Sequence, residues 1–353
     1  MMRNGLYALA GAAMLATSAL HASLAAAQTQ QQIDWCDNSG NAFSVDQQLV
    51  GCTALVESER ASAQDRAAGY SNRCWAYSDK GDPDRAITDC NEAIRLDPKL
   101  ANAYLNRGKA YGDMGDFDRA ISDYDQAIEL NPKSGMAYNN LCDAYLDKGD
   151  NDRAIGDCNR AIQLDPTLAI AYRNRGNAYR YKGEAGSATA DYNQAIELNP
   201  KFSQAYLARG LLSLDAGELP KALADINQAS ALNSEDPYTA LWLDIVNKRS
   251  RLPSRLGEAT AQIDMTKWPA PVIHLYLGQM TPEAVVAAAT DPDASKQKSQ
   301  ACEANFFSGE LALQQGKKDE ATRLFRIADD GCPKDSFQLI AANDELKALG
   351  AQP

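Results

Sequence analysis

A 34-residue repeat runs through residues 67–236, and no other feature of the sequence restricts the fold as strongly. Column 1 of five consecutive blocks is occupied by Ala67, Ala101, Gly135, Ala169 and Ser203. Column 4 is tyrosine in every block, column 15 is glycine, and columns 20 and 27 are alanine. Column 32 is proline in the first four blocks. Agreement at so many positions excludes chance, so we expect one structural unit repeated five times.

The residue types in these columns predict that each block is two helices joined by a turn. Column 11 is tyrosine in the first four blocks, seven residues after the tyrosine of column 4, so the two share one face of the first helix. Glycine at column 15 can adopt the left-handed conformation that ends a helix, and Asp82, Asp116 and Asp150 follow it where the second helix needs an N-cap. Proline at column 32 then ends the second helix.

The period, the small residues and the terminal proline together resemble the tetratricopeptide repeat, a helix-turn-helix unit. The resemblance implies an all-α protein, a right-handed tetratricopeptide α-solenoid with a C-terminal helical extension. We expect a degenerate N-terminal helical cap over residues 28–66 and five repeats over 67–236. A non-repeat helical region over 237–300 and an isolated repeat-like unit with a capping helix over 301–353 are expected to follow.

The cysteines occupy informative positions in the repeat. Three blocks have glycine at column 8 and a bulky residue at column 24, whereas the first and third blocks have cysteine at both. Because these columns face each other across the two helices of one block, we predict disulfides within blocks. Cys36 and Cys52 have the same separation, and Cys302 and Cys332 lie at one end of the last hairpin. The predicted pairs are Cys36 with Cys52, Cys74 with Cys90, Cys142 with Cys158, and Cys302 with Cys332.

Charged residues recur beside these packed columns. Column 7 is arginine in four blocks, and column 23 is aspartate in all five. We expect salt bridges between the two helices of a block, whereas the third block has Leu141 in place of the arginine. The predicted pairs are Arg73 with Asp89, Arg107 with Asp123, Arg175 with Asp191, and Arg209 with Asp225.

The N-terminal sequence has the pattern of a secretory signal peptide over residues 1–27. Arg3 precedes an uncharged apolar run over residues 6–20, and Ala25–Ala27 supply the small residues of a cleavage site. An uncleaved anchor is the alternative, but the run is shorter than the ~20 residues that span a bilayer. No cysteine stands at the cleavage point, so we expect no lipid anchor. We therefore expect a soluble periplasmic or secreted protein, in a compartment that favours disulfides.

The composition excludes several classes of function. With 35 Lys and Arg against 47 Asp and Glu, the formal net charge is -12, which argues against nucleic acid and anionic membranes as partners. Removal of the signal peptide leaves one histidine, His274, and the sequence has no GxSxG, P-loop or CxxC motif. We therefore expect no enzyme, cofactor or metal, and the acidic turns lack the glycine and glutamate of an EF-hand. Carboxylate-based hydrolysis of a sugar stays open as an alternative.

The C-terminal third carries a second resemblance. Residues 238–243 (YTALWL), 274–278 (HLYLG) with 281–283 (TPE), and 303–309 (EANFFSG) with 321–325 (ATRLF) follow one another in an order similar to that of the NlpI family of bacterial outer-membrane lipoproteins. Members of that family are tetratricopeptide adaptors that bind cell-wall hydrolases and a periplasmic processing protease, often as homodimers. The resemblance implies an adaptor for proteins or extended peptides. A self-assembling envelope subunit is the alternative.

In this repeat family the first helix of each block lines the concave face, and the resemblance places the candidate partner-binding residues there. The asparagines could instead tie neighbouring repeats together, and we weigh both roles equally. Arg173, Arg180 and Tyr181 differ from the matching residues of other blocks, which makes them better candidates for ligand binding. The candidates are Trp75, Asn106, Lys109, Asn140, Arg173, Asn177, Arg180 and Tyr181.

Overall fold

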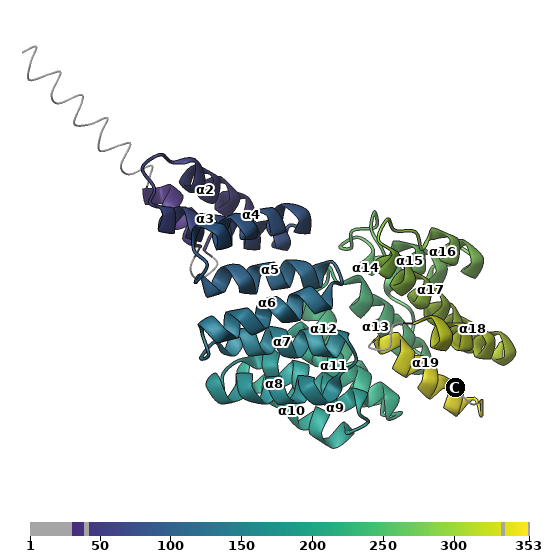
Figure 1. The fold of residues 1–353 in the computed structure, drawn as a ribbon. Helices are drawn as coiled ribbons and strands as arrows, with labels where there is room; N and C mark the ends of the chain where they lie inside the picture. Colours follow the sequence, from purple (N-terminus) through teal and green to yellow (C-terminus); the bar gives the residue numbers. More distant parts are fainter. Residues whose placement is uncertain (1–29, 39–41, 333–335, 352–353) are drawn as a thin grey trace, which may run out of the picture. The chain divides into compact units, whose positions relative to one another are not determined.

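The computed structural model describes residues 30–351 except 39–41 and 333–335 (Figure 1). The predicted signal peptide lies outside the described residues. The chain divides into two compact units, one ending at Pro132 and the other beginning at Lys133. In both, the described residues form helices that pair into antiparallel hairpins, which confirms the predicted all-α solenoid fold.

The described part of the first unit forms three helical hairpins. A helical segment over residues 30–37 pairs with the next helix through the disulfide Cys36–Cys52. The first two blocks of the repeat follow as two hairpins. The helices are α2 (Val45–Glu57), α3 (Ala63–Asp79), α4 (Pro83–Leu96), α5 (Ala101–Asp113) and α6 (Phe117–Leu130).

The second unit begins with the remaining three blocks of the repeat. Their helices are α7 (Gly135–Asp147), α8 (Asn151–Leu164), α9 (Ala169–Tyr181), α10 (Ala185–Leu198), α11 (Ser203–Asp215) and α12 (Leu219–Leu232). Seven further helices follow: α13 (Pro237–Arg249), α14 (Leu256–Ala259), α15 (Ala270–Tyr276), α16 (Pro282–Ala288), α17 (Ala294–Gln314), α18 (Lys318–Gly331) and α19 (Phe337–Ala348).

The turns between paired helices form as the column types predict. Gly149 has a φ of 72°, which only glycine adopts without strain, and the glycine at column 15 of every other block is also left-handed. The side chain of Asp150 then accepts a hydrogen bond from the backbone N–H of Arg153 at 3.1 Å and caps the second helix.

Packing within a hairpin pairs a small residue with a large one. A Cβ atom on Gly108 would lie 2.6 Å from Cε1 of Tyr124, so only glycine lets the two helices approach this closely. In the first and third blocks a disulfide occupies the same place, and all four predicted pairs are bonded. The four predicted arginine–aspartate salt bridges are also present, at 2.6 to 2.7 Å.

The last helices surround an aromatic core. The ring of Trp242 on α13 lies 5.8 Å from Phe306, and Phe306 and Phe307 on α17 pack edge to face at 5.2 Å. Helix α17 begins at Ala294 and continues through residue 300, where the sequence led us to expect a boundary between regions. The helix starts early because Asp293 accepts hydrogen bonds from the backbone N–H groups of Lys296 and Gln297. None of the described helices is both long and apolar enough to cross a membrane.

Candidate partner-binding site

The predicted binding residues lie on the first helix of their repeats, in both units. Five lie in the second unit, where α9 packs against α7 and α11. The other three lie on α3 and α5 of the first unit, so the eight residues form two groups, one in each unit. The second-unit group is Asn140, Arg173, Asn177, Arg180 and Tyr181, and the first-unit group is Trp75, Asn106 and Lys109.

Arg173 is the most distinctive of these residues. It is partly buried on α9, and its guanidinium carbon lies 6.0 Å from the centre of the Phe202 ring. Its Nε atom is buried and has no hydrogen-bond partner in the part of the chain that the structure describes. Because the residue as a whole is only partly buried, the accessible part of this guanidinium is suited to bind an acceptor from another molecule.

Polar and aromatic residues of α9 and α10 lie near Arg173. Asn177 lies one turn further along α9, and its Oδ1 accepts a hydrogen bond from the hydroxyl of Tyr192 at 2.9 Å. Burial raises the pKa of Tyr192 well above its ordinary value, so the hydroxyl stays protonated and acts as a donor. Tyr181 is partly buried against Cys142, Leu146 and their neighbours. These residues offer a polar strip that can hold part of a peptide.

Arg180 takes a different position from the one we expected. It is only 7% exposed, and its Nε and Nη2 atoms donate to Asp215 on α11 at 2.9 and 2.5 Å. The guanidinium therefore braces two successive repeats and is not presented to a partner. In the first unit the same two columns are occupied by Ser78 and Asp113, which also form a hydrogen bond.

Several other candidates also make contacts within the fold. Asn106 donates to the backbone oxygen of Ser71 at 2.9 Å, in the preceding repeat. Lys109 pairs with Asp113 on its own helix at 2.8 Å and donates to the hydroxyl of Ser78, in the preceding repeat, at 3.3 Å. These contacts favour the alternative in which the asparagines tie neighbouring repeats together, and Lys109 has the same role.

Asn140 and Trp75 have less specific surroundings. Asn140 accepts a hydrogen bond from its neighbour Asn139 at 3.3 Å, and Asn139 in turn accepts one from Asn174 of the next repeat at 3.2 Å. Trp75 is partly buried on α3.

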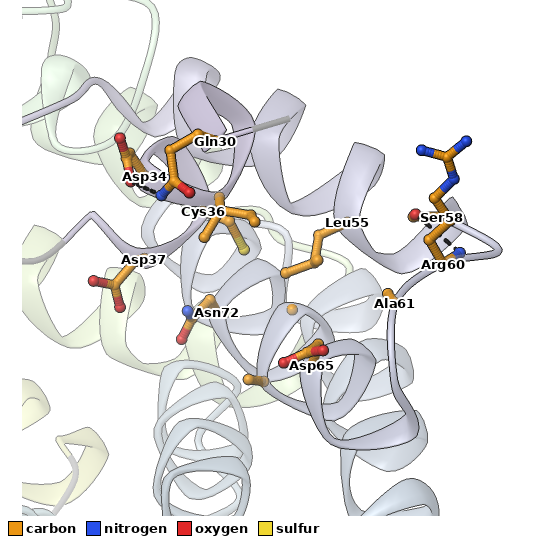
Figure 2. Close-up of a pocket in the computed structure, with 13 residues that line it drawn as sticks. Gln30, Asp34, Cys36, Asp37, Leu55, Ser58, Arg60, Ala61, Asp65 and Asn72 are labelled. Carbon is orange, nitrogen blue, oxygen red and sulfur yellow. Dashed lines mark hydrogen bonds between the residues drawn. The ribbon is translucent and has the colours of Figure 1, made fainter. Parts of the chain in front are cut away.

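Sequence reasoning missed a cavity of about 570 Å³ at the start of the first unit (Figure 2). Ala68 and Asn72 of α3, the first helix of its repeat, form part of its wall, together with Leu55 of α2. Its volume is within the range of ligand pockets. The repeat columns do not extend to residues 30–61, which form most of the remaining wall, so the sequence offered no signal for it. The charged residues that line it are Asp34, Asp37, Arg60 and Asp65.

The described residues offer little for catalysis or metal binding. Among them, no three histidine, cysteine, aspartate or glutamate side chains are placed to hold a metal ion. The Nδ1 atom of His274 lies 2.5 Å from Oε1 of Gln279, near the end of α15. The arrangement on α9 is suited to non-covalent binding.

Comparison with known proteins identifies the repeats. Models described as "Tetratricopeptide repeat" match residues 105–169, 169–202 and 191–224, and a model described as "TPR repeat" matches residues 76–115.

Several solved structures are similar to parts of the chain. The crystal structure of MamA is 30% identical over 44% of this chain and 91% of its own, with a TM-score of 0.39. PilW, described as a widely conserved type IV pilus biogenesis factor, is 21% identical over 58% of this chain and 94% of its own, with a TM-score of 0.49. TTC0263 of Thermus thermophilus, a thermophilic TPR protein, is 21% identical over 51% of this chain and 98% of its own, with a TM-score of 0.47.

Proposed function

The chain is a tetratricopeptide repeat protein, and from that premise we propose that it is an exported scaffold that binds partner proteins along the first helices of its repeats. The observation that carries this proposal is Arg173, whose buried Nε has no partner among the described residues although the chain has more acidic than basic residues. Leaving a buried donor unsatisfied costs about 1–3 kcal/mol. An incoming acceptor would recover that energy.

The ligand that suits this site is an acidic segment of a partner protein. A carboxylate can accept two parallel hydrogen bonds from a guanidinium, and charge-assisted bonds of this kind are about twice as strong as neutral ones. Asn177, which is partly exposed and held in place by the hydroxyl of Tyr192, would add a neutral polar contact beside it. Arg180 has no part in this proposal, because Asp215 already occupies its guanidinium.

The proposed cell compartment and partner class are supported by features of the sequence. Four disulfides and the signal-like residues 1–27 support export to the periplasm or beyond. The order of motifs in the C-terminal third supports cell-wall hydrolases and a periplasmic protease as partners, with the chain itself acting without catalysis. We also propose that the mature chain carries no lipid anchor and forms a homodimer.

A capture experiment tests the site on α9. The mature protein, an Arg173→Gln variant and an Arg160→Gln control are immobilised, and envelope proteins retained by each are quantified by mass spectrometry. Arg160 is exposed on α8, so the control removes the same charge away from the proposed site. We expect a hydrolase or protease that is retained by the wild type and the control and reduced at least about 10-fold by Arg173→Gln. Equal retention by all three proteins would exclude Arg173 as the binding residue.

A further inference from the structure

The first three repeats hold the tyrosine ring of column 11 in the same way. An arginine at column 19 lies over each ring, with its guanidinium carbon 4.3 to 4.5 Å from the ring centre. In the first two repeats the arginine at column 7 also approaches the ring, at 5.9 and 6.0 Å. A guanidinium stacks on an aromatic face and is attracted to it as a cation, so these contacts hold the ring in place. The rings and their covering arginines are Tyr77 with Arg85, Tyr111 with Arg119, and Tyr145 with Arg153.

The fifth repeat keeps the cations and lacks the ring. Column 7 is Arg209 and column 19 is Lys221, but column 11 is Ser213. Lys221 pairs with Glu218 at 2.9 Å, at the two columns where each of the first three repeats pairs an arginine with an aspartate. The charged surroundings of a tyrosine ring are therefore present in this repeat without the ring itself.

A cavity of about 390 Å³ lies where the ring is missing. Its wall comes from α10, α11 and α12 and includes Arg209, Ser213, Glu218 and Lys221. Thr189 of α10 also lines it, at a column where the three preceding blocks have isoleucine. Two smaller residues thus leave a hollow whose volume is within the range of ligand pockets.

The cations of this hollow are accessible. The side chain of Lys221 is 70% exposed and that of Arg209 is 26% exposed. Both are paired with acids of their own repeat, but such pairing leaves room for a ring. Arg107 is paired with Asp123 in the same way and still lies 6.0 Å from the ring centre of Tyr111.

The charges of the wall favour a neutral ring over an ion. Two cations, Arg209 and Lys221, line the hollow together with two carboxylates, Glu218 and Asp225. Each cation is paired with one of these carboxylates, so neither an added anion nor an added cation finds an uncompensated charge. An aromatic face gains from cations even when they are paired, as the rings of the first two repeats do.

The chain itself indicates which group fits the hollow. We propose that it binds an aromatic side chain of a partner protein, whose ring lies beside Arg209 and Lys221 as Tyr111 lies beside Arg107 and Arg119. An aliphatic side chain fills the same space but gains nothing from the two cations. The source of the aromatic residue rests on the proposed adaptor function, whereas the binding of a ring does not.

The proposal is tested with a small probe and the mature full-length chain. N-acetyl-L-tyrosine amide is titrated by ligand-observed NMR, beside the leucine and glutamate analogues. We expect the tyrosine amide to bind more tightly than the leucine amide, which is apolar without a ring, and than the glutamate amide, which is an anion. Equal binding of either analogue would overturn the proposal.

Filling the hollow locates the binding. Ser213→Tyr supplies the ring that the other repeats have, so it should abolish binding of the tyrosine amide and raise the melting temperature. Gln228→Tyr is the matched control, because it adds a tyrosine at an exposed position of α12 outside the cavity wall, and it should bind normally. Equal binding by the two variants, or a lower melting temperature for Ser213→Tyr, would show that the hollow is not a site for a ring.

Removing a cation tests how the ring is held. Lys221→Gln should weaken binding of the tyrosine amide roughly 2- to 5-fold, as expected for one exposed cation–π contact. Lys201→Gln removes the same charge at an exposed position outside the wall and should have no effect. Equal affinities for these two variants would exclude the contact with Lys221.

Circular dichroism establishes that each variant is folded. Arg173→Gln should leave the affinity for the tyrosine amide unchanged, so the result is independent of the binding site proposed on α9. Binding of the tyrosine amide that Ser213→Tyr abolishes supports the hollow as a ring site even if no partner is captured through Arg173.

Discussion

The backbone of Gly176 lies so close to Tyr192 that a Cβ atom at position 176 would come within 2.6 Å of ring atom Cε1. Tyr192 has no exposed surface, so its ring has no space into which it can retreat. The pair joins α9 to α10 within one repeat. Because helices approach this closely only where one side chain is missing, the glycine fixes the spacing of the hairpin.

Two glycines of the same repeat should therefore respond in opposite ways to alanine. We expect Gly176→Ala to destabilise the fold by about 1–3 kcal/mol through overpacking. Gly186 lies on α10, where an added Cβ would meet no atom within 4 Å, and Gly186→Ala should stabilise by up to about 1 kcal/mol because alanine favours the helix. Urea unfolding followed by circular dichroism measures both, and a neutral Gly176→Ala would contradict the packing argument.

The disulfide Cys142–Cys158 should be replaceable by the pair found in the next repeat. The two cysteines stand at the columns of Gly176 and Tyr192, and their Cα atoms are 5.4 Å apart. When the disulfides are reduced, the wild type should lose stability. A Cys142→Gly, Cys158→Tyr double variant should lose about 2–3 kcal/mol less, because it has no bond to break at this place. A double alanine variant at the same positions is the control and should be less stable than the Gly–Tyr pair, because it leaves a gap.

The buried and exposed arginine pairs should differ in their contribution to stability. Arg175 donates two hydrogen bonds to Asp191, which is 5% exposed, at 2.6 and 2.7 Å. Arg175→Ala leaves that carboxylate buried without this partner, and we expect a loss of about 3 kcal/mol. Arg153 pairs with Asp150 on the surface, where water screens the two charges, so Arg153→Ala should cost much less than Arg175→Ala. Similar losses for both variants in chemical denaturation would refute the distinction.

The stability of the second unit should fall as the pH rises through neutrality. Burial raises the pKa of Glu310 from 4.5 to about 7, so the folded chain binds this proton more tightly than the unfolded chain. The resulting stability is fully present below about pH 4.5 and is lost as the pH rises through about 7.

Glu310→Gln isolates this effect, because glutamine does not titrate. Between pH 5 and pH 8 the wild type should lose on the order of 1–3 kcal/mol relative to the variant. The free energies of unfolding of both proteins at the two pH values give the sign. A wild type that gains stability relative to the variant at pH 8 would contradict the raised pKa of the buried Glu310 carboxyl.

The sequence predicted contacts within a repeat better than contacts between repeats. Columns 8 and 24 belong to one hairpin, so the regular pairing of Gly108 with Tyr124 and of Cys74 with Cys90 could be read from the period. Arg180 was misplaced because its partner Asp215 lies 35 residues away, in the next repeat. The 34-residue period does not indicate which columns of successive repeats contact each other.

The cavity of about 240 Å³ among the C-terminal helices was beyond sequence reasoning for a related reason. Its wall combines helices from four distant segments, α11, α13, α17 and α19. No local sequence pattern indicates that Arg249 donates hydrogen bonds to both Glu310 and Glu345. A weak signal existed, since Glu310 is the single charged residue between Phe306 and Gln314. A lone acid in such a stretch indicates a buried charge but does not identify its partner.

The placement of the disulfides has a mechanical consequence. In the described part of the chain each of the four bonds closes a single hairpin, and three of them enclose a separation of 16 residues. A force applied along the chain can detach such a hairpin from its neighbours but cannot pull out the segment between its cysteines. Each of the three bonds thus shortens the fully extended chain by roughly 50 Å. A protein built in this way would yield to tension in separate steps and would keep its hairpins intact while doing so.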